Sequence, residues 1–143
     1  MIELTDISKI FNMGKTNEYV ALSGINLAIQ LNKITVFRGP SGSGKTTLLN
    51  IIGSLDDPSE GRAEVLGKSV SELTHKESAK LRNLHIGFIF QTYNLLSVYT
   101  VFENVEFALL LQDMSAAERK KAVMESLAIL PSSAKIMSLP PPP

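Results

Sequence analysis

A run of small residues followed by lysine and threonine carries the clearest chemistry in this sequence. Residues 39–47 read Gly-Pro-Ser-Gly-Ser-Gly-Lys-Thr-Thr and fit the phosphate-binding pattern G-x-x-x-x-G-K-[ST]. Backbone N–H groups at a helix N-terminus favour anions, and glycines let the backbone wrap closely around them. The pattern therefore predicts a P-loop that binds the phosphates of a nucleoside triphosphate.

The side chains of this loop have distinct predicted roles. Lys45 is expected to place its ammonium on the β- and γ-phosphates, and the Thr46 hydroxyl is expected to bind Mg²⁺. Thr47 is expected to begin the helix proper, where its N–H and hydroxyl could reach the α-phosphate. The predicted nucleotide-binding residues of the loop are Gly39, Pro40, Ser41, Gly42, Ser43, Gly44, Lys45, Thr46 and Thr47.

The segments on either side of the loop support this interpretation. Ile34-Thr35-Val36-Phe37 is apolar and β-branched, which predicts a strand. Apolar residues at 48–52 predict a short helix that Gly53 can end. Strand, glycine loop and helix in this order favour a phosphate site over a glycine-rich turn that merely contains Lys-Thr.

The composition is that of an ordinary globular protein, with 44% hydrophobic residues, 20% charged residues and a net charge of +0. Without a basic excess, nucleic acid is not an expected partner. No apolar run approaches the ~18 residues of a membrane span, and the N-terminus lacks the features of a signal peptide. There is no cysteine, which excludes thiol catalysis and cysteine zinc sites, and the isolated His75 and His85 lack metal-ligand spacing.

Other elements can be placed from local patterns. Strands are expected at residues 2–8, 22–29, 63–66 and 86–90, with a polar loop at 12–18, a turn at 56–61 and a polar surface helix within 72–84. Thr100 and Ser115 each open a [ST]-x-x-E capping box, which predicts two more helices that end by Pro131. The prolines at 140–143 predict exposed, extended chain.

Three blocks of sequence resemble the N-terminal part of an ABC transporter ATP-binding subunit, and most of all the lipoprotein-release and macrolide-export subfamily. They are residues 39–50, residues 52–61 (IGSLDDPSEG) and residues 86–96 (IGFIFQTYNLL) with 103–106. The second and third blocks are specific to this family, whereas the first is shared with other P-loop proteins. The resemblance covers about residues 1–130, which correspond to about the first half of a family member.

The resemblance implies an α/β fold of the P-loop NTPase class. It would be a truncated ABC-type nucleotide-binding domain with an N-terminal antiparallel β part, a portion of the P-loop core and the start of a helical subdomain. Residues 1–130 would form this partial domain, and residues 131–143 would be a proline-rich tail foreign to the family. A frameshift before the proline codons is one expected cause.

The resemblance also assigns roles outside the loop. Phe11 falls where the family has an aromatic residue that stacks on adenine; core packing is the other interpretation of Phe11, and Tyr19 is the alternative stacking residue. Gln91 falls at the family's Q-loop glutamine, which approaches Mg²⁺ and the attacking water, although a simple strand cap is possible. The catalytic candidates are therefore Lys45 and Gln91, and the metal candidates are Thr46 and Gln91.

An apolar set between residues 92 and 105 resembles the surface that receives the membrane subunit of the transporter, with ordinary packing between helices as the alternative. Its members are Tyr93, Leu95, Leu96, Tyr99 and Phe102.

The family's remaining catalytic parts do not occur in this sequence. There is no Leu-Ser-Gly-Gly-Gln signature, no Walker B strand ending in Asp-Glu and no histidine at the switch position. The strands near 34–38 and 86–90 would accordingly lack their usual neighbours, which predicts marginal stability.

The main functional hypothesis is an ATP-binding subunit of an ABC transporter. It would bind Mg-ATP, work as a dimer with a second ATP-binding subunit, and lie on the cytoplasmic face of the inner membrane against a transmembrane permease. The alternative is a truncated, non-catalytic remnant that binds nucleotide or partner without turnover. A small-molecule kinase shares the P-loop but not the block at 86–96, and a small GTPase would need a guanine-reading Asp that is absent from Asn32-Lys33-Ile34-Thr35.

Overall fold

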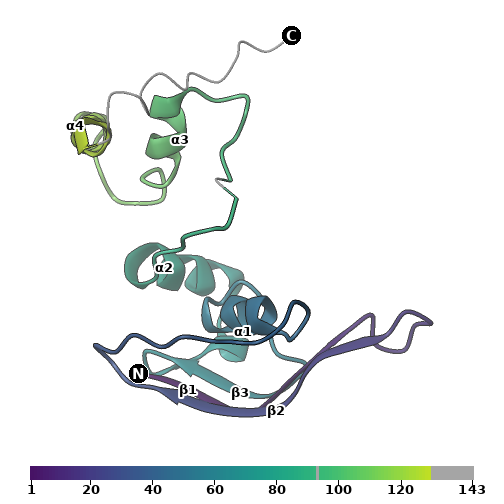
Figure 1. The fold of residues 1–143 in the computed structure, drawn as a ribbon. Coiled ribbons are helices and arrows are strands. Elements are labelled where there is room, and N and C mark those ends of the chain that lie inside the picture. Colours follow the sequence, from purple (N-terminus) through teal and green to yellow (C-terminus); the bar gives the residue numbers. More distant parts are fainter. Residues whose placement is uncertain (93, 130–143) are drawn as a thin grey trace. The chain divides into compact units, whose positions relative to one another are not determined.

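The computed structural model describes residues 1–92 and 94–129. It divides the chain into two compact units, Met1–Ile86 and Gly87–Pro143 (Figure 1). The first unit contains β1 (Ile2–Phe11), β2 (Tyr19–Ile29), α1 (Lys45–Ile52), β3 (Glu60–Val65), β4 (Lys68–Ser69), the 3-10 turn η1 (Val70–Glu72) and α2 (His75–His85). The second contains α3 (Val101–Phe107) and α4 (Ala116–Ile129).

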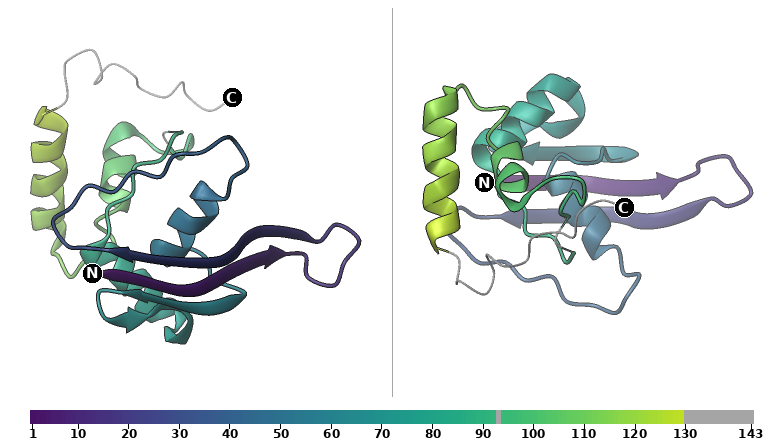
Figure 2. Two further views of the ribbon diagram at one scale, coloured as in Figure 1. Left: turned by 60° about the horizontal axis from the view of Figure 1, so that its bottom comes forward. Right: turned by 90° about the horizontal axis from the view of Figure 1, so that it is seen from above.

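The first unit is built on an antiparallel sheet with the strand order β2-β1-β3-β4. β1 pairs with β2 along its whole length, from Ile2 opposite Ile29 to Phe11 opposite Tyr19. Its pairing with β3 ends at Ser8, opposite Glu60. The far part of the β1–β2 hairpin therefore runs out past β3 as a two-stranded arm (Figure 2).

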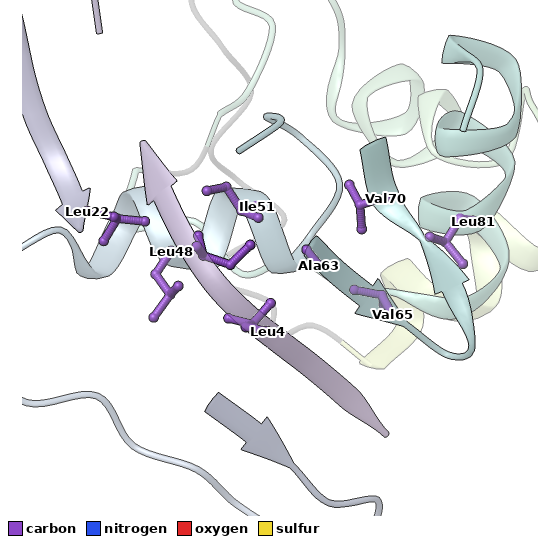
Figure 3. Packing of buried hydrophobic residues seen from close by; sticks show 9 residues of the cluster. Leu4, Leu22, Leu48, Ile51, Ala63, Val65, Val70 and Leu81 are labelled. Carbon is purple, nitrogen blue, oxygen red and sulfur yellow. The ribbon is translucent and has the colours of Figure 1, made fainter. Parts of the chain in front are cut away.

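One hydrophobic cluster joins this sheet to α1 and α2. Side chains from β1, β2 and β3 meet Leu48 and Ile51 of α1 and Leu81 of α2 (Figure 3). The cluster consists of Leu4, Ile7, Leu22, Leu48, Ile51, Ala63, Val65, Val70 and Leu81. Because burial of such side chains stabilises by about 25 cal/mol per Å² of apolar surface, this cluster is the main force that holds α1 against the sheet.

A glycine allows β3 to approach β1 at an irregularity in their pairing. The register shifts between Thr5 and Ser8, where Asp6 has a positive φ of 53°. Gly61 faces this bulge with a φ of 86°, and a Cβ at Gly61 would overlap the Asp6 carbonyl group and lie 2.5 Å from the Thr5 carbonyl oxygen. Only glycine fits here, which gives a physical role to the last residue of the block 52–61.

Two predicted strands do not form. Residues 34–37 and 86–90 carry strand-like sequences, but neither is paired with another strand in the described part of the chain, and Ile86 instead follows the end of α2. Ile34 and Ile89 are almost fully exposed, at 96% and 102%. Strand propensity alone does not make a strand, since the backbone needs a hydrogen-bonding neighbour and the side chains need a surface to cover.

The other predicted elements form with changed bounds. The strands expected at 2–8, 22–29 and 63–66 are longer and begin or end elsewhere, and β4 was not predicted. The helix expected within 72–84 is α2, which begins after its own capping box between Thr74 and Glu77. That T-x-x-E signal was present in the sequence and was missed.

The second unit is organised by hydrogen bonds around α3 and α4. The two predicted capping boxes are confirmed, because Thr100 and Glu103 bond reciprocally before α3, and Ser115 and Glu118 do so before α4. Val123 of α4 is fully buried. The predicted end of the helices at Pro131 and the tail 131–143 lie outside the described residues.

Asn104 holds the segment before α3 in place. Its Oδ1 accepts a bond from Leu96 N–H at 2.8 Å, and its Nδ2 donates to the carbonyls of Leu96, Tyr99 and Thr100 at 2.9–3.1 Å. One amide side chain thus contacts four backbone groups of the loop, with its two N–H hydrogens shared among the three carbonyl oxygens. Sequence reasoning did not find this role, although Asn104 lies in the third family-like block.

Among the described residues, the helices are all too short or too polar to cross a lipid bilayer.

Gly61→Ala is expected to destabilise the first unit severely. The new methyl group meets backbone atoms that cannot move aside, so we expect a loss above about 4 kcal/mol in the free energy of unfolding. Gly67→Ala is the matched control, because Gly67 also has a positive φ, 76°, but a Cβ there meets no described atom within 4 Å. Gly67→Ala should lower the free energy of unfolding by only about 1–2 kcal/mol, which is the cost of placing a non-glycine residue in the left-handed conformation. Urea unfolding followed by circular dichroism measures both, and equal losses would contradict the overlap.

The capping boxes predict a loss of helix stability in acid. The pKa values of Glu77 and Glu118 lie below the usual 4.5 because a hydroxyl and then a backbone N–H of the capping residue donate to the carboxylate; for Glu103 the Thr100 N–H is the larger cause. Because the folded pKa values are the lower ones, this stabilisation is present above pH 4.5 and is lost as the pH falls through the lowered values.

The triple variant Glu77→Gln, Glu103→Gln and Glu118→Gln tests this dependence. Glutamine keeps an acceptor for each box but does not titrate, so helix content below pH 4.5 should fall less steeply than in the parent. Far-ultraviolet circular dichroism against pH gives the comparison, and identical slopes would contradict the prediction.

Candidate functional site: the phosphate loop

The glycine loop enters α1 through a left-handed residue that touches the sheet. Gly44 is the N-cap of α1 with φ 82° and ψ 2°. A Cβ at Gly44 would lie 2.6 Å from the Ala21 carbonyl oxygen and 2.7 Å from Leu22 Cδ2, both in β2. The loop therefore approaches β2 more closely than any residue with a side chain could, which fixes the start of α1 beside that strand.

The Lys45 ammonium folds back onto the loop. Its Nζ donates to the carbonyl oxygens of Gly39 at 2.9 Å and Pro40 at 2.6 Å, and to Ser43 Oγ at 2.9 Å. An ammonium has three donors, and here all three are directed at the loop that surrounds it. The positive charge is thus held within the loop, at the N-terminal end of α1 where the helix dipole also favours an anion.

An open cavity of about 410 Å³ lies over this loop. It is lined by Gly39, Ser41, Gly42, Ser43, Gly44, Lys45, Thr46, Thr47 and Tyr19. Eight of the nine predicted loop residues therefore share one cavity, and Pro40 contributes its carbonyl to Lys45 instead.

The helix begins two residues earlier than predicted. α1 starts at Lys45 rather than Thr47, because Gly44 already serves as the N-cap. Thr46 and Thr47 consequently lie within the first turn, and both still line the cavity.

The residues present fit a bound magnesium ion only in part. The described residues hold no cluster of three His, Asp or Glu side chains that could bind a metal. Thr46 lines the cavity, and among the described residues its hydroxyl has no hydrogen-bond partner. Mg²⁺ commonly takes one or two protein ligands and fills its shell with phosphate oxygens and water, which this arrangement suits.

The two candidate aromatics differ in their relation to the cavity. Tyr19 lines it, and its hydroxyl lies 3.4 Å from the Gly42 carbonyl oxygen. Phe11, directly opposite on β1, is absent from the lining, and its ring carries the Lys9 ammonium at 5.1 Å. Phe11 is 38% exposed, so it is not a core residue.

Gln91 and the apolar set belong to the second unit, whereas the phosphate loop belongs to the first. Gln91 is exposed and follows the extended residues 86–90. Of the apolar set, Leu95, Leu96 and Tyr99 are exposed at 57%, 41% and 40%, whereas Phe102 is half-buried and Tyr93 lies outside the described residues.

Comparison with known proteins decides the family. The profile described as "ABC transporter" matches residues 22–139, well over half of the chain. The chain belongs to the ABC transporter family. Its match includes the phosphate loop and the blocks at 52–61 and 86–96 that carried the resemblance.

Curated proteins with similar sequences are also named as ATP-binding proteins. An uncharacterized ABC transporter ATP-binding protein of Thermotoga maritima is 39% identical over 130 residues, which are 91% of this chain and 55% of that protein. The lipoprotein-releasing system ATP-binding protein LolD of Hahella chejuensis is 40% identical over 121 residues, which are 85% of this chain and 52% of that protein. The chain therefore spans about half the length of these relatives.

A solved structure shows the same fold. The dimeric structure of MJ0796, a bacterial ABC transporter cassette, matches with a TM-score of 0.79 and 40% identity, over 90% of this chain and 56% of that one. A second structure of MJ0796, in a post-hydrolysis state bound to ADP and Pi, matches with a TM-score of 0.78. The predicted fold class, an ABC-type P-loop domain present in its N-terminal part, is confirmed.

Gly44→Ala is expected to disrupt the loop, because the new methyl group would overlap the Ala21 carbonyl oxygen, which is backbone and cannot move aside. Gly42→Ala is the matched control: Gly42 has a similar φ of 80°, but a Cβ there meets no described atom within 4 Å. We expect Gly44→Ala to weaken tripolyphosphate binding at least about tenfold and Gly42→Ala to weaken it less, since only the first displaces α1. Isothermal titration calorimetry checks this, and a larger loss in Gly42→Ala would contradict it.

Proposed function

We propose that this chain binds Mg-ATP through residues 39–47, as the nucleotide-binding part of an ABC transporter ATP-binding subunit. The observation that carries the proposal is the Lys45 ammonium, which sits among the loop carbonyls at the N-terminus of α1 beneath an open cavity. Positive charge, backbone N–H groups and space for phosphates occur together there.

Lys45 would exchange its partners when the nucleotide binds. Its present acceptors are two neutral carbonyl oxygens and one hydroxyl. Phosphate oxygens are charged acceptors, and charge-assisted hydrogen bonds are roughly twice as strong as neutral ones. The ammonium would therefore move from the loop to the β- and γ-phosphates without leaving the cavity.

Magnesium would be held by the phosphates and by the Thr46 hydroxyl in the first turn of α1. It would supply charge neutralisation at the β- and γ-oxygens. Gln91 would add its amide oxygen to the metal and position water, as the family resemblance implies. The roles of Lys45, Thr46 and Gln91 in catalysis are part of this proposal.

The wider assembly is also proposed. MJ0796 forms a dimer, and relatives carry names that refer to lipoprotein release and macrolide export. We infer that this chain associates with a second ATP-binding subunit and with a transmembrane permease on the cytoplasmic side of the membrane. The exposed Leu95, Leu96 and Tyr99, held in place by Asn104, are the proposed contact with the permease.

A second candidate function is binding without turnover. The sequence contains no Leu-Ser-Gly-Gly-Gln segment and no Asp-Glu pair after a hydrophobic strand. Phosphoryl transfer needs an acidic partner for Mg²⁺ and groups that stabilise charge in the transition state. The phosphate loop by itself accounts for binding of Mg-ATP, and a phosphate-release assay decides whether turnover accompanies binding.

Lys45→Ala tests the main proposal. The parent should bind Mg-ATP, and its unfolding midpoint should rise with ATP concentration because the ligand binds the folded state. Lys45→Ala should abolish both effects. Lys33→Ala is the control, since Lys33 is an exposed lysine outside the cavity lining and should behave as the parent.

Calorimetry and thermal unfolding give the binding result, and a phosphate-release assay separates the two candidate functions. Release that depends on Lys45 supports an ATPase, whereas binding without release supports the second candidate. If Lys45→Ala binds Mg-ATP as tightly as the parent does, the proposed site is wrong.

A further inference from the structure

We propose that Arg82 of α2 is a positioning residue for the phosphate loop, because it anchors the C-terminal end of α1, the helix whose N-terminus faces the phosphate cavity. The inference rests on the proposed binding of phosphates by residues 39–47. It adds to that site a residue that lies outside both the P-loop motif and the cavity lining.

The turn that ends α1 contains a serine in the left-handed conformation. Ser54 N–H donates to the Ile51 carbonyl at 2.9 Å, and Leu55 N–H donates to the Asn50 carbonyl at 2.8 Å. This pair of bonds is the Schellman motif, in which the residue at the position of Ser54 is usually glycine. Ser54 nevertheless has a φ of 54°. A residue other than glycine persists in this conformation only when the surrounding structure holds it there.

Arg82 provides this support from the neighbouring helix α2 (Figure 1). Its Nη1 donates to the Ser54 carbonyl oxygen at 2.5 Å, in a partly buried position. Ser54 is only 7% exposed, so water has little access to take the place of this bond. Among the described residues Arg82 forms no ion pair, and its contact is therefore with the backbone of the turn rather than with an acidic side chain.

The charge of Arg82 also suits the end of a helix. The C-terminus of a helix carries partial negative charge from its unpaired carbonyl groups, and a cation there is stabilising. α1 has no basic residue in its last turn. The guanidinium of α2 therefore supplies the cation that the sequence of α1 lacks, at the end opposite to the one that faces the phosphate cavity.

The position of α1 depends on contacts along its whole length, because the helix is short. It has 8 residues, and isolated helices of this length are not stable in water. Gly44 fixes its start against β2, and Leu48 and Ile51 pack into the core. The Arg82 bond fixes its end, and Lys9 of β1 makes two bonds to the turn that follows. Without the Arg82 bond the end of α1 can shift, and the backbone N–H groups at its start shift with it.

The test is calorimetric titration of the full chain with Mg-tripolyphosphate, which carries phosphates but no nucleoside and so reports on the loop alone. Arg82→Ala should weaken binding about fivefold, because part of the free energy of one charged hydrogen bond is passed on to the ligand. Lys80→Ala is the matched control, since Lys80 is an exposed cation on the same helix and its removal changes the net charge equally. It should stay within about twofold of the parent.

Two further variants separate positioning from a loss of stability alone. Gly67→Ala is expected to destabilise the same unit without touching α1, so at a temperature where it is folded it should bind tripolyphosphate as the parent does. Arg82→Lys keeps the cation and a donor and should recover most of the affinity. Hydrogen exchange of the amides of residues 45–52 should be faster in Arg82→Ala and unchanged in Lys80→Ala, with circular dichroism confirming that each variant is folded.

The outcomes are distinguishable. If Arg82→Ala binds tripolyphosphate as tightly as the parent, the inference is wrong and the proposed function is unaffected. Equal losses of affinity in Arg82→Ala and Gly67→Ala would overturn it as well, because affinity would then follow stability alone. An Arg82→Lys variant that binds no better than Arg82→Ala would also overturn it. A parent chain that binds neither Mg-ATP nor tripolyphosphate, or a Lys45→Ala variant that binds both as the parent does, would instead overturn the proposed function on which the inference rests.

Discussion

The close approach of Gly44 to the Ala21 carbonyl is the constraint on which the first unit depends. It places the N-terminus of α1 beside β2 at a distance that no side chain would permit. Leu48 and Ile51, one and two turns later, then reach the cluster on the sheet. The same contact thus positions the phosphate loop and seats the helix in the core.

The two units are stabilised in different ways. The first has a contiguous apolar cluster that spans three strands and two helices. In the second unit, hydrogen bonds of polar side chains hold the loops to the helices. Asn104 bonds the segment before α3, and Arg119 bonds both Glu106 and the Met114 carbonyl. Hydrogen bonds exposed to water contribute modestly each, because water competes for the same groups. Among the described residues of the second unit, Val123 is the one buried apolar side chain, and many apolar side chains around α3 are exposed.

The extended segments 34–37 and 86–90 show what local sequence does not decide. Both have the β-branched and aromatic residues of buried strands, yet neither is paired in the described part of the chain, and Ile34 and Ile89 face solvent. Pairing is a property of two segments, and a strand buried on both faces needs cover from elsewhere. MJ0796, of which this chain covers 56%, shares this fold with a TM-score of 0.79.

The phosphate loop, the helix that follows it, two of the three capping boxes and the family were predictable from sequence, since each depends on residues close together in the chain; the third box also had its T-x-x-E signal there. Glycine, lysine and threonine at set spacing specify local backbone and charge without further help. Three features could be seen only in the folded chain. They are the fit of Gly61 against the Asp6 bulge, the Asn104 contacts with the loop before α3, and the place of Tyr19, rather than Phe11, in the cavity lining. The positions of Gly61 and Tyr19 depend on the register of β1 against β3 and β2, and register is set by how whole faces pack, which no single segment encodes. The Asn104 contacts depend instead on how the loop before α3 folds back onto that helix.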